Sequence, residues 1–471
     1  MTESELLALS ATALAARIRA GELRCVQAME ATLARASEVQ TRLNSFIRVD
    51  AERALSAAHA ADRDAAAGRW RGPLHGVPMA HKDMYYRAGE ISTCGSKILR
   101  DRTATRTANA LARLDAAGAI QFATLNMSEF AFNPTGHNWH FGHCRNAWHA
   151  DYITGGSSSG SGTSVAARAN FAALGSDTGG SIRLPASFCG TVGIMATVGR
   201  VSRAGAMPLS HSLDRVGPLT RSVEDAAQLL AVLAGEDADD PTCERRAVPD
   251  FVAALGRPVK GLRIGRPTQY FNDEADADVV SRMEASLEVL RGLGATVVDV
   301  EPPGLAAAAA AWSMVAASEA AALHAQWLRE RPQDYSDQIR TRLAQGLAIP
   351  AHAYLNALRM RGPALQAFCD AVFSKCDVLH APVVGFATPT IAESEVGGSP
   401  EMMAVLGRIT RLTRPVSFLG LPALAVPVGF LSNGLPTAMQ LIGRPFDEAT
   451  LFAVGHAYQG ASDWHERAPA L

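Results

Sequence analysis

Hydrophobic positions near the start of the chain recur at the spacing of helical turns. One stripe reaches Leu23 and a second begins at Val26; the members are Leu6, Leu7, Leu14, Ile18 and Leu23, then Val26, Met29, Leu33 and Ala36. Residues three and four positions apart share one face of a helix. Residues 3–67 are therefore expected to be helical, with a third helix over 51–68.

Beyond residue 72, short apolar runs alternate with longer amphipathic stretches. The runs predict strands over 76–83, 119–125, 171–175, 261–265, 296–300, 378–381, 423–428 and 437–442. The stretches predict helices over 107–117, 164–170, 275–294, 305–329, 334–373, 402–412 and 448–459. This alternation predicts an α/β fold in one large domain, with a central mixed, mainly parallel twisted β-sheet covered by helices on both faces.

Composition and charge limit the cellular compartment and the partners that we expect for the protein. The 471 residues include 44 basic and 46 acidic side chains, which gives no basic field for nucleic acid. The first residues are acidic where a signal peptide needs base, and the uncharged stretches 304–318 and 415–431 are alanine-rich or broken by proline. Seven scattered cysteines suit a reducing compartment. A cytoplasmic protein without nucleic-acid or membrane partners is expected.

Two glycine turns carry the candidate chemistry. The first spans 154–163 and reads Thr-Gly-Gly-Ser-Ser-Ser-Gly-Ser-Gly-Thr, and the second spans 176–183. A linker does not fit the middle of a domain, and the residues that follow exclude a phosphate-binding P-loop and a dinucleotide fingerprint. A nucleophile elbow centred on Ser158 stays open, although its oxyanion motif is absent.

An interpretation that joins both turns to Lys82 explains more of the pattern. A serine becomes nucleophilic when a neutral lysine removes its proton. Holding lysine neutral near pH 8 requires its pKa to fall by over ~2 units, about 3 kcal/mol at ~1.4 kcal/mol per unit, which burial can supply. Asp83 should face the opposite side of the strand. Backbone N–H groups of Thr178, Gly179, Gly180 and Ser181 could converge as an oxyanion hole.

Together these motifs strongly resemble the amidase signature enzymes. The resemblance rests on the strand that ends at Lys82, on the Gly/Ser run, on Gly-Ser-Asp-Thr-Gly-Gly-Ser-Ile-Arg-Leu-Pro, and on the 24 residues between Ser157 and Ser181. It covers roughly 5–460 and is densest over 70–225. It implies a domain over 1–471 with an N-terminal helical segment (1–68), a signature core (70–225) and a remainder with substrate-pocket helices (226–460).

The resemblance also implies a Ser–Ser–Lys triad. Ser181 would attack the carbonyl and form an acyl-enzyme, Ser157 would bridge Ser181 and Lys82 as proton relay, and Lys82 would be the general base. Relatives hold the bridging serine with a cis peptide, here Gly156–Ser157. Asp177 and Arg183 are interpreted as structural supports. No cofactor is implied.

Substrate contacts are expected from the loop over 126–150. Phe132, His137 and Trp139 are candidate wall residues, and Arg342 is a candidate partner for a carboxylate. His137, His140 and His143 also allow a metal site as an interpretation, since imidazole suits zinc. Their spacing fixes no ligand geometry, so no metal is assigned.

Two function classes compete within this resemblance. The main expectation is an amidase that hydrolyses the C–N bond of a small acyl- or aryl-amide, with a small-molecule amide and water as its partners and a homodimer as one assembly. The alternatives are the glutaminase A subunit of a tRNA-dependent amidotransferase and a ureido-acid hydrolase of the carboxybiuret or allophanate type. Thr410 stands where the glutaminase subunit carries an aspartate for the α-ammonium of glutamine, which favours a less polar amide.

Overall fold

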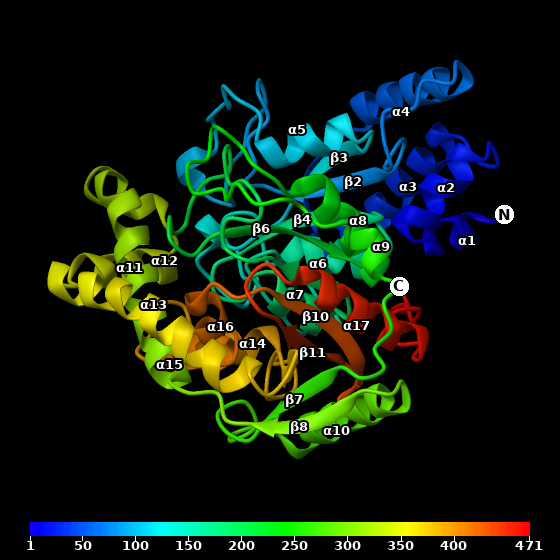
Figure 1. The fold of residues 1–471 in the computed structure, drawn as a ribbon. Coiled ribbons are helices and arrows are strands. Elements are labelled where there is room, and N and C mark those ends of the chain that lie inside the picture. The colour runs from blue at the N-terminus through cyan, green and yellow to red at the C-terminus, as the bar shows by residue number, and fades with distance from the viewer.

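One eleven-stranded sheet runs through the whole molecule (Figure 1). A computed structural model describes all residues, 1–471. The strand order is β1-β3-β2-β4-β6-β5-β10-β11-β9-β7-β8. The strands are β1 (Phe46–Val49), β2 (Pro78–Lys82), β3 (Ile120–Leu125), β4 (Ala172–Asp177), β5 (Val192–Met195), β6 (Arg215–Thr220), β7 (Arg263–Pro267), β8 (Thr296–Val300), β9 (Val378–Pro382), β10 (Ala423–Phe430) and β11 (Pro436–Ile442).

The sheet is mixed, as expected, although the balance of pairings differs from the expectation. Four neighbouring pairs are parallel, β2–β3, β2–β4, β7–β8 and β7–β9. Six are antiparallel, β1–β3, β4–β6, β5–β6, β5–β10, β10–β11 and β9–β11. Short connections such as 431–435 join antiparallel neighbours without a crossover helix. The alternation of strands and helices in the sequence therefore underestimates the number of antiparallel pairs.

Seventeen α-helices surround the sheet. They are α1 (Glu3–Ala8), α2 (Ala11–Arg19), α3 (Cys25–Leu43), α4 (Ala51–Ala66), α5 (Asn109–Ala116), α6 (Ser159–Ala166), α7 (Arg183–Cys189), α8 (Val223–Leu233), α9 (Phe251–Ala254), α10 (Ala277–Gly292), α11 (Leu305–Glu330), α12 (Asp337–Leu347), α13 (Ala351–Phe373), α14 (Ile391–Ser394), α15 (Met402–Thr410), α16 (Arg414–Leu419) and α17 (Glu448–Gly460). The two ends of the chain lie on the same side of the molecule (Figure 1).

Strand β10 shows how helices cover both faces of the sheet. Leu424 and Val426 belong to the same apolar cluster as residues of α17, and Gly455 of α17 lies against both. Ala425, between them, belongs to a different cluster with Ile182 and Leu184 at α7. Because successive strand residues point to opposite faces, α17 and α7 lie on opposite sides of β10. The fold class expected from the sequence is confirmed.

Helix α6 differs from its expected position. The sequence pattern predicts a helix over 164–170, whereas α6 begins at Ser159, within the Gly/Ser run. Gly160 explains the difference, because a Cβ there would lie 2.3 Å from the carbonyl oxygen of Ser45. The glycines let this helix pack against neighbouring backbone, which outweighs their poor helix propensity.

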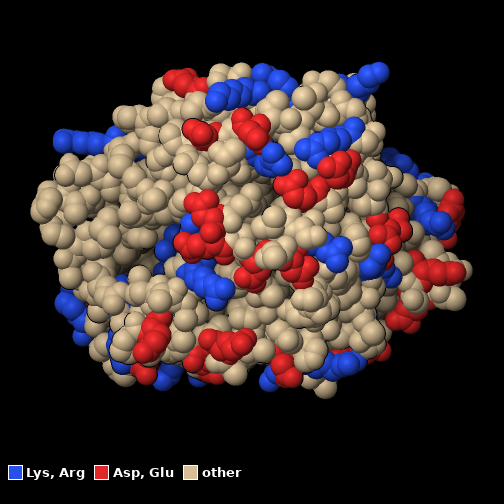
Figure 2. Space-filling view, turned by 90° about the horizontal axis from the view of Figure 1, so that it is seen from below, with Lys and Arg blue, Asp and Glu red and all other residues tan.

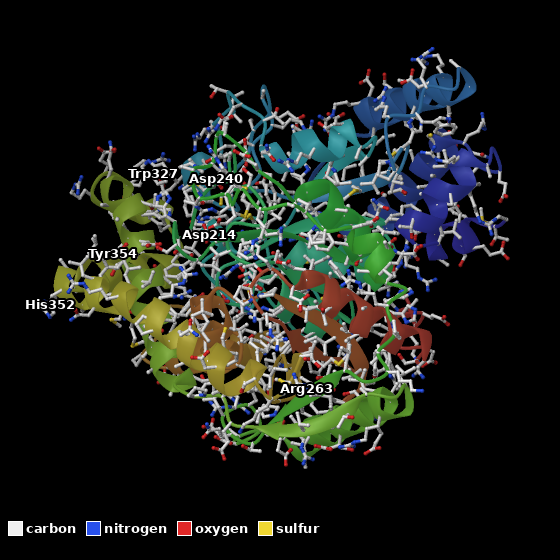
Figure 3. All side chains as sticks on the ribbon, in the orientation of Figure 1. Asp214, Asp240, Arg263, Trp327, His352 and Tyr354 are labelled. Atoms are coloured by element: carbon white, nitrogen blue, oxygen red, sulfur yellow. The ribbon has the colours of Figure 1, made fainter.

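A group of helices, α11 to α13, extends to one side of the sheet, and Figure 3 labels Trp327, His352 and Tyr354 on it. One helix is expected over 334–373, but α12 ends at Leu347 and α13 starts after Pro350. Proline disfavours the helical conformation in the residue before it, which explains the break. Helix α11 is long and apolar enough to cross a membrane, yet half of that stretch is buried inside the fold, as in a core helix.

Candidate active site

Lys82 lies at the end of β2 and is completely buried. Its Nζ lies within hydrogen-bond distance of three serine hydroxyls: Ser157 Oγ at 2.6 Å, Ser176 Oγ at 2.8 Å and Ser158 Oγ at 3.1 Å. The first glycine turn brings two of these serines, and the end of β4 brings the third. The structure therefore joins Lys82 to both glycine turns, as the joint interpretation of the motifs requires.

The surroundings of Lys82 favour its neutral form. Burial lowers the pKa of Lys82 from 10.5 to about 7, against weaker opposing effects of Cys94, Asp214 and Asp177. Asp83, next in the chain, accepts a hydrogen bond from the N–H of Thr93 at 3.0 Å and makes none to Lys82. A neutral amine surrounded by hydroxyls can accept a proton from any one of them.

Ser181 lies in the turn between β4 and α7, with 9% of its surface exposed. Its carbonyl oxygen accepts a hydrogen bond from the N–H of Ser158 at 3.3 Å. No hydrogen bond joins Ser181 Oγ to Ser157 Oγ. Of the expected chain from Ser181 through Ser157 to Lys82, the structure therefore shows only the bond between Ser157 and Lys82. The Gly156–Ser157 peptide bond is cis, as the family resemblance implies.

The turn that carries Ser181 presents backbone N–H groups. The N–H of Gly180 donates to Asp177 Oδ1 at 2.7 Å, which removes it from the predicted oxyanion donors. The N–H groups of Thr178, Gly179 and Ser181 have no acceptor within the protein. Three of the four predicted donors are therefore free to bind a developing oxyanion.

Two side chains from distant elements hold this turn. Trp312 of α11 donates from Nε1 to the carbonyl oxygen of Thr178 at 2.7 Å. Asp214 accepts a hydrogen bond from Thr178 Oγ1 at 2.6 Å and is itself fixed by the N–H groups of Leu209 and Ser210. Burial raises the pKa of Asp214 against these hydrogen bonds.

Asp177 and Arg183 form a completely buried ion pair beneath the turn, with 3.0 Å between Arg183 Nε and Asp177 Oδ2. Arg183 also donates to Gln440 Oε1 at 2.9 Å and to Ser417 Oγ at 2.7 Å. Burial acts to raise the pKa of Asp177, but Arg183 and the backbone hydrogen bonds outweigh it and the pKa stays below its usual value. The pair ties the turn to α16 and β11.

A tight cavity of about 20 Å³ opens beside Ser181. Its lining includes Phe132 and Arg342, both candidates from the sequence, together with Trp312, Thr410 and Arg414. The guanidinium of Arg342 lies 3.6 Å from the centre of the Phe132 ring and donates to the Phe132 carbonyl oxygen. The structure therefore places two of the sequence candidates together beside Ser181.

His137 and Trp139 do not line this cavity, contrary to expectation. His137 Nε2 bonds Ser394 Oγ at 3.0 Å, and Trp139 Nε1 donates to Glu395 at 3.3 Å, so both residues fasten their loop to the end of α14 and the residue after it. His137, His143 and Glu395 each offer one donor atom within 4.8 Å of the others. His140 bonds Glu129 at 2.9 Å and stands apart from that group.

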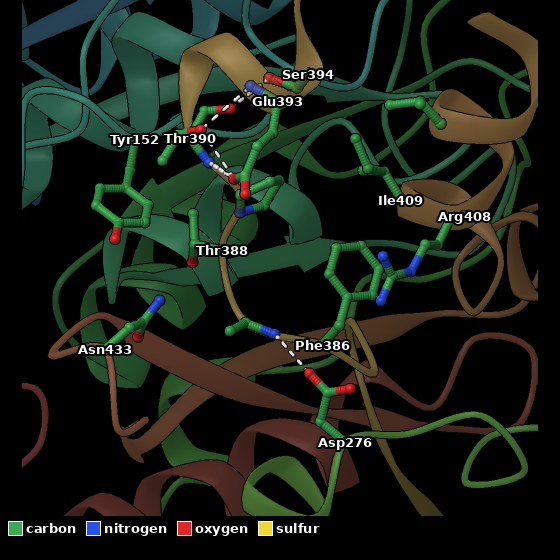
Figure 4. Close-up of a pocket in the computed structure, with 13 residues that line it drawn as sticks. Tyr152, Asp276, Phe386, Thr388, Thr390, Glu393, Ser394, Arg408, Ile409 and Asn433 are labelled. Carbon is green, nitrogen blue, oxygen red and sulfur yellow. Dashed lines mark hydrogen bonds between the residues drawn. The ribbon is translucent and has the colours of Figure 1, made fainter. Parts of the chain in front are cut away.

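A second, larger cavity of about 490 Å³ does not have Ser157, Ser176 or Ser181 in its lining (Figure 4). Phe386 and Arg408 stack on one side of it, with 4.2 Å from guanidinium to ring centre, and Tyr152 and Asn433 lie across the opening. None of the predicted catalytic residues lines it. Of these two cavities, only the smaller one includes Ser181 in its lining.

Four residues of the site escape sequence reasoning. Ser176, Trp312, Asp214 and Arg414 reach Lys82, the turn that carries Ser181 or the cavity beside it from separate elements. Ser176 alone had a local signal, because it immediately precedes Asp177 in the second glycine turn. The other three depend on tertiary contacts between residues more than thirty positions apart.

Comparison with known proteins agrees with this geometry. The family model described as Amidase matches residues 27–452. The chain is 39% identical over 479 residues to the A subunit of the glutamyl-tRNA(Gln) amidotransferase of Halorhodospira halophila (strain DSM 244 / SL1), covering 97% of this chain and 98% of that relative.

Solved structures give the same result. One described as a vestigial protein complex that reveals the evolutionary origins of an s-triazine catabolic enzyme has a TM-score of 0.90 and 34% identity, covering 96% of this chain and 99% of that chain. The A subunit of the glutamyl-tRNA(Gln) amidotransferase from Thermotoga maritima has a TM-score of 0.80 and 29% identity, covering all of this chain and 97% of that chain.

These comparisons correct one expectation. The set of partners expected from the sequence, a small-molecule amide without nucleic acid, is contradicted by full-length similarity to subunits of an enzyme named for its tRNA substrate. The expectation rested on a near-neutral charge, and Figure 2 does show acidic and basic groups intermixed on one face. It was wrong because the charge of a single chain does not report the partners of an assembly.

Proposed function

The chain belongs to the amidase family, and we propose that it is the amide-hydrolysing A subunit of an amidotransferase, acting through an acyl-enzyme on Ser181. The observation that carries this proposal is the buried Lys82, whose pKa is lowered and whose Nζ contacts Ser157 Oγ. The next residue, Ser158, is hydrogen-bonded to Ser181, whose turn presents free backbone N–H groups. Similarity to these A subunits over nearly the whole length supports the assignment to an assembly.

The proposed chemistry begins with the three triad residues. Ser181 Oγ forms a bond to the amide carbonyl carbon while its proton passes to Ser157 Oγ, which gives its own proton to Lys82 Nζ. Rotation of the Ser181 side chain toward Ser157 closes the open step of this relay. The N–H groups of Thr178, Gly179 and Ser181 bind the oxyanion of the tetrahedral intermediate.

Breakdown of the intermediate reverses the proton path. The C–N bond breaks, and the leaving nitrogen receives the proton that Lys82 holds, through Ser157. Water then attacks the acyl-enzyme, losing its proton to the same relay and releasing the acid and Ser181. In the assembly, the nitrogen would be transferred to glutamyl-tRNA(Gln), as the name of the relatives states.

A ureido-acid hydrolase is the second candidate. Thr410 favours it, because its hydroxyl donates to the Leu406 carbonyl oxygen at 2.7 Å and carries no negative charge to pair with an α-ammonium. The similarity to a structure described with an s-triazine catabolic enzyme adds support. A cytoplasmic location fits both candidates, since all seven cysteines are free.

Replacement of the A subunit in a known enzyme tests the proposal. The purified chain is added to amidotransferase of Halorhodospira halophila prepared without its own A subunit, and Gln-tRNA(Gln) formation is measured. We expect amidation with the wild-type chain and none with Ser181→Ala. Amide hydrolysis by the chain alone, without restored amidation, would instead support the ureido-acid hydrolase, and hydrolysis by Ser181→Ala at a tenth of the normal rate would contradict the acyl-enzyme.

A further inference from the structure

Three side chains that can bind a metal ion meet between the loop over 126–150 and the end of α14. His137 and His143 come from the loop, and Glu395 immediately follows the helix. Each residue offers one donor atom, and the three atoms lie within 4.8 Å of one another. None of the three lines the cavity beside Ser181, so the proposed amide hydrolysis does not use this His–His–Glu cluster.

The structure changes the membership of the histidine group that the sequence suggested. His140 bonds Glu129 at 2.9 Å and is not part of the cluster. Glu395 takes its place, although it lies 252 positions after His143. Two imidazoles and a carboxylate are ligands that zinc prefers in three-ligand sites, where water completes the tetrahedron.

The spacing of the cluster suits such a site. Zinc–nitrogen bonds of about 2.0 Å place neighbouring ligand atoms of a tetrahedron about 3.3 Å apart. His143 Nε2 and Glu395 Oε1 are already 3.2 Å apart. Glu395 has room to adjust toward His137, because 44% of its side chain is exposed.

Both histidines are oriented through one ring nitrogen. The backbone N–H and carbonyl oxygen of Asn138 lie 3.1 and 3.0 Å from His143 Nδ1, and Nε2 of the same ring faces Glu395. His137 Nε2 lies 3.0 Å from Ser394 Oγ, and its Nδ1 is buried without a hydrogen-bond partner. Contacts of this kind orient histidine ligands of metals, and a buried nitrogen without a partner gives His137 a donor to spare.

The carboxylate supplies the negative charge and the route of entry. Glu395 Oε1 accepts a hydrogen bond from Trp139 Nε1 at 3.3 Å, which orients it toward the histidines. No lysine or arginine forms an ion pair with Glu395, and 18% of the His143 side chain is exposed. A cation from solvent can therefore reach the cluster without displacing another positive charge.

The loop that carries both histidines also contacts the catalytic turn. The carbonyl oxygen of Pro134, three residues before His137, accepts a hydrogen bond from the N–H of Gly156 at 2.7 Å. Gly156 immediately precedes Ser157. A link between His137 and α14 therefore restrains a loop that holds the backbone beside Ser157.

We propose that His137, His143 and Glu395 form a zinc site, with water as the fourth ligand, that fastens the loop over 126–150 to the end of α14. The ion is a structural link at a distance from the substrate cavity. The inference goes beyond the proposed function and does not depend on amide hydrolysis.

Zinc binding to the full-length chain, prepared without a histidine tag, tests the inference. The chain is stripped of metal with a chelator, and zinc chloride is then titrated calorimetrically. We expect one zinc ion per chain and a higher unfolding temperature with zinc, because an ion that binds only the folded state stabilises it. A chain that binds no zinc, or whose unfolding temperature zinc does not raise, would overturn the inference.

Glutamate variants locate the ion. Glu395→Gln keeps the size of the side chain and an oxygen for Trp139 but removes the charge, and it should weaken zinc binding by about 100-fold or more. Glu393→Gln is the matched control: Glu393 bonds Thr390 in the capping box of α14, a position where glutamine also serves, and its affinity for zinc should be unchanged. Equal affinities in the two variants would contradict the assignment to Glu395.

Histidine variants give a second, spectroscopic readout. Cobalt(II) bound in place of zinc should give the visible absorption of a tetrahedral site in the wild-type chain. His143→Asn should lose this absorption, whereas His149→Asn, which changes an exposed histidine of the same loop, should keep it. An unchanged spectrum in His143→Asn would place the metal elsewhere and overturn the site, whatever the outcome for amide hydrolysis.

Discussion

Lys82 and Asp83 are neighbours in the chain, yet their side chains occupy separate environments. Lys82 contacts three serine hydroxyls, while Asp83 accepts hydrogen bonds from the N–H and hydroxyl of Thr93. Burial also raises the pKa of Asp83, to about 7. The separation leaves Lys82 without a carboxylate partner, so burial controls its protonation and determines the pH range in which it can act as a base.

Activity should therefore fall as the pH drops through 7. The folded-state pKa of Lys82 is about 7, so its neutral, proton-accepting form is lost below that pH. We expect kcat/KM for amide hydrolysis to have an acid limb with an apparent pKa near 7 and to level off above pH 8. A profile that is flat between pH 5 and 9 would exclude Lys82 as the general base.

Lys82→Met should abolish activity without destabilising the fold. Activity should fall by roughly 10³-fold or more, as for loss of a member of a catalytic unit. Because the folded pKa of Lys82 lies below its unfolded value, the unfolded chain binds more protons between pH 7 and 10.5, and wild-type stability rises with pH in that window. Urea unfolding should show a smaller rise for Lys82→Met. The same slope in both proteins would contradict a buried, neutral lysine.

Ser176 should matter although it is outside the predicted triad. Its hydroxyl lies 2.8 Å from Lys82 Nζ, so Ser176→Ala removes one of three contacts that orient the amine. We expect kcat to fall by about tenfold, the cost of roughly one hydrogen bond, with KM nearly unchanged. Ser159→Ala is the matched control, since Ser159 is also buried but donates to the carbonyl oxygen of Asn126. Equal losses in both variants would indicate a general packing effect.

The sequence predicts the local parts of this site well and the distant parts poorly. Lys82, Ser157 and Ser181 stand in motifs whose spacing is visible along the chain, and the structure brings Lys82 and Ser157 into contact. The fold class follows from alternating apolar runs in the same way. Ser181 shows the limit, because its hydroxyl makes no hydrogen bond to Ser157 in this structure, and no pattern in sequence encodes that.

The cavity beside Ser181 illustrates what local patterns do not determine. Arg342 and Arg414 come from α12 and α16, and they share a cavity only because α11 packs against both helices. His137 was expected in the same cavity because of its loop, yet its side chain turns to Ser394. Long-range packing determines these positions, whereas the local pattern determines only that the segments are helix or loop.

Trp312 should support catalysis through its indole N–H. Trp312→Phe keeps an aromatic ring against Gly179 but leaves the carbonyl oxygen of Thr178 without its donor. We expect kcat/KM to fall by about tenfold and the unfolding free energy by about 1–3 kcal/mol, because a buried acceptor loses its partner. Trp327→Phe, on the same helix, replaces a ring that stacks on Phe130 and should leave kcat unchanged. A larger loss of kcat in that control would contradict the assignment.

The buried pair of Asp177 and Arg183 should be strongly stabilising as a unit. Arg183→Met leaves the Asp177 carboxylate buried without its ion-pair partner, and we expect the unfolding free energy to fall by about 3–5 kcal/mol. In the wild type the lowered pKa of Asp177 adds stability above the unfolded pKa, and that stability is lost as the pH falls through the folded pKa. In the variant, burial would instead raise the pKa of Asp177, so the deficit should shrink between pH 8 and pH 5. Adding Asp177→Asn should recover part of the loss, because it removes the unpaired charge. Urea unfolding of both variants at the two pH values measures this, and an equal deficit at pH 5 and pH 8 would show that the charge of Asp177 is not the cause.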